Sequence, residues 1–160
     1  MDTLLSKLPY TEYCERQGNS AWSAEPVNAV TTIALLISAY YIFKLLKKKN
    51  KINDKKFIFL PLLLAASAFG NVIYHTLPNP VAYLADVVPL GLFWLIISYL
   101  IKNLLFIGLG FIVAVYLRSL DQVICNNFTI GSHFVLHILI AIAAYYAVKS
   151  LLTIYESEKN

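Results

Sequence analysis

Charged residues are scarce in this chain, and their scarcity excludes an ordinary soluble domain. Only 14% of the 160 residues are Asp, Glu, Lys or Arg, whereas 59% are hydrophobic. A typical soluble domain is about a quarter charged. The sequence also has no P-loop, no dinucleotide-binding fingerprint and no aromatic platform for stacking bases. We therefore expect a membrane protein that has no nucleic-acid partner.

The first 26 residues contain neither a stretch apolar enough to cross a bilayer nor a cleavable signal peptide. The letters MDTLLSKLPYTEYCERQGN lack the basic region and following apolar core that a signal peptide has. We expect residues 1–26 to form a short ordered segment at the membrane surface.

Long apolar stretches follow this segment. A helix that crosses a bilayer needs about 20 mainly apolar residues. The stretch that begins at Leu104 is the weakest of these. It reaches the required length only if it continues to Ile124, with the Arg118 side chain extending toward the membrane interface. The sequence predicts an all-α integral membrane bundle in a single domain over residues 1–160, with five helices at about 27–46, 57–77, 81–101, 104–124 and 132–154.

The orientation of the bundle is predicted by seven lysines between Lys44 and Lys56, which lie in the first loop between apolar stretches. Cytoplasmic loops are enriched in lysine and arginine. With this loop in the cytoplasm, the N-terminus lies outside and the C-terminus inside. Lys102 and Lys149 then also fall on the inner side.

The chain has only two cysteines, Cys14 and Cys125, and this topology places both on the outer side. Disulfides persist in that environment, and two cysteines allow one pairing. We predict a bridge between the N-terminal segment and the connection between the fourth and fifth helices. Two unrelated free thiols are the alternative, since sequence does not show their separation.

The only three histidines, His75, His133 and His137, all lie near the outer ends of predicted helices, as does Asp86. Ionisable groups inside a membrane are costly and often functional. His133 and His137 are four residues apart, which places both rings on one helical face. We predict that the histidines bind one zinc ion and leave a position open for water. Asp86 would hold that water or accept its proton.

Other interpretations of these residues remain open from spacing alone. Two histidines can hold a haem, and a carboxylate beside histidines can relay protons. Interfacial histidines can also simply bond to headgroups or backbone. A channel would need polar residues that continue to the inner face, and the second and fifth predicted helices largely lack them.

Six short motifs occur in order along the chain: YCER, AEPVNAVT, GNVIYHT, LADVVP, RSLDQVIC and GSHFVLH. Together they resemble the small bacterial membrane proteins of the alkaline ceramidase family. That family belongs to a superfamily of zinc-dependent membrane hydrolases that includes adiponectin-receptor-like proteins. The resemblance covers residues 13 to about 145. It implies a bacterial inner-membrane enzyme of sphingolipid metabolism whose site near the outer face cleaves the N-acyl bond of ceramide or a related lipid.

The resemblance also implies individual roles. His75, His133 and His137 match the zinc ligands, and Asp86 matches the acidic residue beside the catalytic water. Asn71 stands where the family has a serine, one turn before His75, and its amide would donate to a developing oxyanion. The same substitution favours the alternative function, a non-catalytic receptor-like protein or assembly subunit with a structural zinc site.

In alkaline ceramidases an acidic N-terminal segment binds calcium close to the zinc, and the resemblance extends to this segment. Carboxylate and amide oxygens suit such a cation. Here Gln17 replaces an asparagine, and the spacing to Glu25 is one residue shorter. A solvated acidic segment is the alternative to a calcium site formed by Glu12, Tyr13, Glu15, Gln17 and Glu25.

The family usually has seven membrane-spanning helices, whereas five are predicted here. RSLDQVIC resembles the end of the family's sixth helix, so the missing pair corresponds to the fourth and fifth. Loss of a helical hairpin preserves the orientation of the remaining helices. We expect a shortened form of the seven-helix fold, with the uncovered surface exposed or buried by homo-oligomerisation.

Overall fold

A computed structural model describes residues 13–17, 19, 21–102 and 105–157. The regular elements in these residues are all helices, and their bounds agree with the predicted ones to within three residues. The predicted first helix is divided at Thr32 into two. The helices are α2 (Pro26–Thr31), α3 (Ile33–Lys48), α4 (Lys55–Thr76), α5 (Pro80–Ile101), α6 (Leu105–Ile124) and α7 (His133–Ser157).

Local chemistry explains where several of these helices begin. Pro26 and Pro80 stand in the first turns of α2 and α5, where the missing proline N–H costs nothing. The side chains of Asp54 and Asn79 accept hydrogen bonds from the backbone of the first turns of α4 and α5. Such side chains satisfy N–H groups that the helix itself leaves free.

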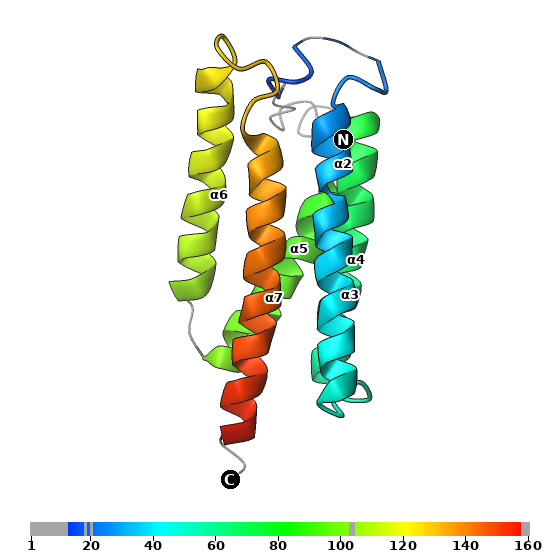
Figure 1. Cartoon of the computed structure of the whole chain (residues 1–160), viewed down its shortest axis with the longest axis vertical. Coiled ribbons are helices and arrows are strands. Elements are labelled where there is room, and N and C mark those ends of the chain that lie inside the picture. Colours follow the sequence, from blue (N-terminus) through cyan, green and yellow to red (C-terminus); the bar gives the residue numbers. More distant parts are fainter. Residues whose placement is uncertain (1–12, 18, 20, 103–104, 158–160) are drawn as a thin grey trace.

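The helices form an elongated bundle, and α5 crosses it behind α7 (Figure 1). α3 packs against both α4 and α7, and α5 contacts α4, α6 and α7. One end of the bundle, here called the histidine end, carries the described residues 13–25, the α4–α5 turn and the α6–α7 connection. The opposite end, here called the lysine end, carries the loop between α3 and α4. The two ends thus separate the lysines from the histidines.

The core between these helices combines large apolar side chains with small residues. Ile42 of α3, Leu64 of α4, Phe93 of α5 and Val148 of α7 are fully buried members of one cluster. Small residues let two helices approach closely in a membrane. Ser38 uses this closeness to donate a hydrogen bond of 2.7 Å to the carbonyl oxygen of Ala141 on α7.

Gly70 permits an even closer contact between α4 and α5. A Cβ atom on Gly70 would lie 2.3 Å from the backbone carbon and oxygen of Ala85. A side chain at position 70 would therefore push the two helices apart at the level of Asp86.

The outer surface of the bundle is apolar over its length. Large side chains such as Tyr99, Val81 and Phe69 are mostly exposed. Within the described residues, four helices of 22 to 25 residues are long and apolar enough to cross a bilayer: Pro26–Lys48, Lys55–Thr76, Pro80–Ile101 and His133–Ser157. Such a helix is about 33 Å long, which matches a hydrocarbon core of about 30 Å. The chain is a helical membrane bundle, as predicted.

Candidate metal centre

The three histidines meet at the histidine end of the bundle. His75 comes from the last turn of α4, while His133 and His137 come from the first two turns of α7. One side-chain nitrogen from each lies within 4.8 Å of the others. The ring centroid of His75 is 5.2 Å from that of His133 and 5.1 Å from that of His137. The predicted convergence of imidazoles from two helices is confirmed.

These imidazoles carry buried nitrogen atoms that have no hydrogen-bond partner among the described residues. They are Nε2 of His75, Nδ1 of His133 and Nε2 of His137. A buried polar atom without a partner costs about 1–3 kcal/mol, and three such atoms in one place are unusual. Because neutral imidazole nitrogen is a preferred ligand of transition metals, a bound cation is the partner that this donor set fits.

The second ring nitrogens of two histidines are held by other side chains. Nδ1 of His75 lies 2.5 Å from Oε2 of Glu25, and Nδ1 of His137 lies 3.0 Å from Oγ1 of Thr31. A carboxylate only accepts, so Nδ1 of His75 carries the proton. Thr31 already donates to the carbonyl oxygen of Val27, so its oxygen accepts from His137. In both neutral rings the lone pair is then on Nε2. A histidine that binds a metal usually donates from its other ring nitrogen to a neighbouring group in this way.

Arg16 extends this network to the N-terminal segment. Its guanidinium pairs with Oε1 of Glu25 and donates to the carbonyl oxygen of His75 at 2.9 Å. Burial alone raises the pKa of Glu25, but its interactions with His75 and Arg16 outweigh this effect and hold the pKa below its ordinary value. The carboxylate therefore stays charged. Sequence reasoning missed Arg16, which lies 59 positions from its partner His75.

Tyr13 covers the histidines from outside the bundle. Its ring stacks on His133 with a centroid distance of 4.0 Å, and the Arg118 guanidinium lies 5.5 Å from the Tyr13 ring centroid. Burial raises the pKa of the Tyr13 hydroxyl well above its ordinary value, so the phenol stays neutral. The next residue, Cys14, forms a disulfide with Cys125. This bridge ties the Tyr13 cover to the end of α6.

Asp121 of α6 joins the disulfide region to the start of α7. Its fully buried carboxylate accepts backbone hydrogen bonds from Cys14 at 3.0 Å, from Ser132 at 2.6 Å and from His133 at 2.9 Å. Sequence reasoning gave no role to Asp121. The sequence feature that could have indicated a role for Asp121 is its position one helical turn before Cys125, in the motif RSLDQVIC.

Asp86 of α5 is held by two side chains of α4. Asn71 donates from Nδ2 to one carboxylate oxygen at 2.9 Å, and Ser67 donates to the other at 3.2 Å. The carboxylate is buried, and its partner Asn71 lies one helical turn before His75 in α4. The amide that was expected to serve an oxyanion thus has one donor engaged by Asp86. Within the described part of the chain, Asn71 Oδ1 has no hydrogen-bond partner. Sequence reasoning missed the role of Ser67.

Most of the expected calcium ligands that the structure describes have partners within the chain. Glu15 accepts from the backbone N–H groups of Val27 and Asn28 at 2.6 and 2.9 Å, so it caps α2. Glu25 pairs with Arg16 and His75, Tyr13 stacks on His133, and Gln17 is exposed. Glu12 lies outside the described residues. In this network the cation beside Glu25 is a guanidinium.

Comparison of the chain with protein-family models, with curated proteins and with solved structures found no match. Function is therefore inferred from the chemistry of this site together with the motifs of the sequence.

Proposed function

We propose that this chain is a zinc-dependent membrane amidohydrolase that cleaves the N-acyl bond of ceramide or a related N-acyl lipid. The observation that carries the proposal is the meeting of three buried imidazoles whose nitrogens lack a partner among the described residues. A buried carboxylate, Asp86, is held by Asn71 one helical turn before His75. A closed structural zinc site has four protein ligands, whereas a catalytic one has three. The motif resemblance to alkaline ceramidases points to the same chemistry.

His75, His133 and His137 would hold the zinc, and Glu25 and Thr31 would orient two of these ligands. When bound, zinc lowers the pKa of a water molecule from about 15.7 toward about 7 and polarises a carbonyl group. Asp86 would accept the proton of the attacking water and then donate it to the departing amine. Asn71 and Ser67 hold both oxygens of Asp86 and fix the direction in which the carboxylate faces.

A lipid substrate agrees with the depth of the site. His75 is the second-last residue of α4, and His133 is the first residue of α7. The metal would thus lie near one face of the bilayer, where the polar linkage of a lipid also lies. With the lysine end in the cytoplasm, this face is the outer one, in keeping with a site on the outer side of a bacterial inner membrane.

The test measures zinc and fatty acid release in the same purified samples. We expect one zinc per chain and release of fatty acid from an N-acyl lipid, and both are lost in His133→Ala. Asp86→Asn keeps the zinc and loses the release. Turnover that persists after a chelator has removed the zinc, or in Asp86→Asn, contradicts the proposal.

The second candidate function is a non-catalytic membrane protein with a structural zinc, either receptor-like or an assembly subunit. The observation that favours it is the Tyr13 ring, which is buried and stacks directly on the ligand His133. This candidate predicts zinc binding without lipid turnover in both the native chain and Asp86→Asn. A homo-oligomer fits either function, because the bundle is smaller than the seven-helix fold that the motif resemblance implies.

A further inference from the structure

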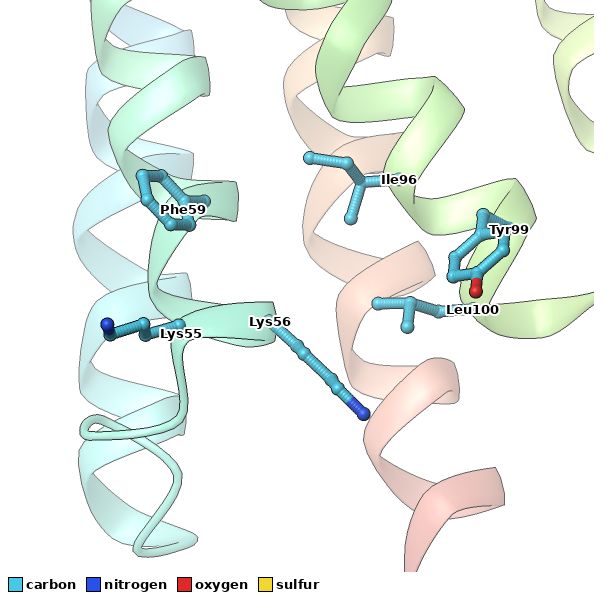
Figure 2. A pocket seen from close by; sticks show the side chains of 6 residues that line it. All are labelled: Lys55, Lys56, Phe59, Ile96, Tyr99 and Leu100. Atoms are coloured by element: carbon cyan, nitrogen blue, oxygen red, sulfur yellow. The ribbon is translucent and has the colours of Figure 1, made fainter.

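A groove opens at the lysine end of the bundle, between the first turns of α4 and the last turns of α5. Its volume is about 250 Å³, and Figure 2 shows the side chains that line it. The groove lies near the opposite end of α4 from His75, so it is separate from the metal centre. The lining residues are Lys55, Lys56, Phe59, Ile96, Tyr99 and Leu100.

The groove follows from the way in which α4 and α5 cross. The two helices touch at Gly70 and Ala85, near the histidine end. From this contact they diverge toward the lysine end, where α5 lies apart from α4 (Figures 1 and 2). The divergence leaves apolar side chains facing a gap that no described side chain fills.

The mouth of the groove is positively charged. Lys56 extends across the gap, whereas Lys55 points along the other side of α4 (Figure 2). Both are exposed, and neither pairs with a carboxylate within the described residues. Asp54 lies next to them but accepts the backbone N–H of Lys56 as a helix cap. The start of α4 adds the positive end of the helix dipole.

Two other lysines at this end have partners. Lys49 pairs with Glu156 at 2.7 Å, and Lys51 lies 4.5 Å from the centroid of the Tyr155 ring. Lys47 and Lys48 are also exposed at this end but do not line the groove. The ligand that complements a basic mouth and an apolar lining is an anion with an apolar tail.

We propose that this groove binds an anionic phospholipid, with its phosphate at Lys56 beside the start of α4 and one acyl chain along Phe59, Ile96 and Leu100. Basic pockets between transmembrane helices commonly hold anionic lipid headgroups. Tyr99 has an exposed ring near the end of α5, at the level where tyrosine favours the membrane interface. The groove is smaller than the roughly 300–1,000 Å³ pockets that enclose whole small ligands, so it holds only part of the lipid.

The experiment titrates the purified full chain in neutral detergent with phosphatidylglycerol or phosphatidylcholine and counts bound lipids by native mass spectrometry. We expect preferential retention of phosphatidylglycerol. Two lysines near a membrane surface contribute about 1 kcal/mol each, so the double variant Lys55→Gln/Lys56→Gln binds it at least about tenfold more weakly.

The matched control is Lys47→Gln/Lys48→Gln. It removes the same charge from two exposed lysines at the lysine end that do not line the groove, and we expect less than a twofold effect. Equal losses in both double variants, or no loss in either, overturn the proposal. Helical circular dichroism confirms that each variant is folded.

A second pair of variants separates a lipid from free phosphate. Ile96→Trp fills the groove and leaves both lysines in place, so it abolishes the preference for phosphatidylglycerol. Leu92→Trp places the same ring one turn earlier on α5, outside the groove, and leaves binding unchanged. Full retention in Ile96→Trp, or equally effective competition by inorganic phosphate, shows that no acyl chain binds in the groove and overturns the assignment. None of these outcomes depends on the metal centre.

Discussion

Gly70 brings the backbone of α4 into direct contact with Ala85 of α5, and this contact places Ser67 and Asn71 within hydrogen-bond distance of Asp86. The proposed proton acceptor thus depends on a residue without a side chain. The closeness of the two helices is the physical link between packing and chemistry.

Gly70→Ala is expected to push α4 and α5 apart and to disturb the hydrogen bonds that hold Asp86. The new Cβ would meet backbone atoms of Ala85 at 2.3 Å, and backbone cannot rotate away as a side chain can. Overpacking of this kind costs roughly 1–3 kcal/mol. We expect a lower melting temperature and a loss of lipid hydrolysis larger than the loss of zinc, measured by thermal unfolding, product release and metal content.

Gly91→Ala is the matched control, because no atom lies within 4 Å of a Cβ built on Gly91 in α5. Alanine favours a helix over glycine by about 1 kcal/mol, so this variant should be as stable as the native chain or more stable. Similar behaviour of the two alanine variants would show that the contact at Ala85 carries no strain.

Thr31 offers a test of how the zinc ligands are oriented. Thr31→Val keeps the shape of the side chain and removes the oxygen that accepts from Nδ1 of His137. Loss of such a partner behind a metal ligand lowers affinity about 10- to 100-fold. We expect a weaker zinc affinity in this range, measured by competition with a chromogenic chelator.

Thr32→Val is the neighbouring control. The Thr32 hydroxyl is buried and donates to the carbonyl oxygen of Ala29, with no histidine contact. We expect a small loss of stability and an unchanged zinc affinity. Equal zinc affinities in the two valine variants would show that Thr31 does not orient His137.

Much of the fold could be predicted because it depends on local patterns. The length of each apolar stretch gave helix bounds close to the observed ones. The spacing of His133 and His137 placed both rings on one face of α7. The lysine-rich loop predicted which helix ends lie on the same side of the membrane. This prediction placed His75 at the same end of the bundle as His133 and His137.

The residues that support the site could not be predicted in the same way. Thr31 and His137 are 106 positions apart, and Cys14 and Asp121 are 107 apart. Such pairs leave no periodic signal, because their meeting depends on how the helices cross. Arg16 was overlooked for a related reason: acidic neighbours suggested a metal, while the cation that pairs with Glu25 belongs to the chain itself.

The disulfide between Cys14 and Cys125 closes a loop with a sequence separation of 111 residues. Long loops of this kind give about 2–5 kcal/mol of stabilisation. Cys125→Ser should therefore lower the melting temperature, and zinc should exchange faster because Tyr13 is less firmly held over His133. Stopped-flow chelation measures the exchange rate.

The bridge also predicts non-additivity. Cys14→Ser, Cys125→Ser and the double variant break the same bond, so we expect the same loss in all three. A reducing agent should lower the melting temperature of the native chain to that of the variants and leave the variants unchanged. Additive losses would mean that the cysteines act separately.

Asp121→Asn tests whether the start of α7 is set from α6. The native carboxylate accepts three backbone N–H groups, including that of His133, and an amide offers only one accepting oxygen. At least one buried N–H group then loses its partner, which costs about 1–3 kcal/mol. Because the backbone of His133 shifts when this N–H group loses its partner, we expect a lower melting temperature together with weaker zinc binding.

Asp54→Asn is the control. Asp54 caps α4 at the lysine end, and asparagine caps a helix as well as aspartate, so this variant should change neither the melting temperature nor the zinc affinity. Reduced stability with native zinc affinity in Asp121→Asn would show that His133 is positioned by α7 alone.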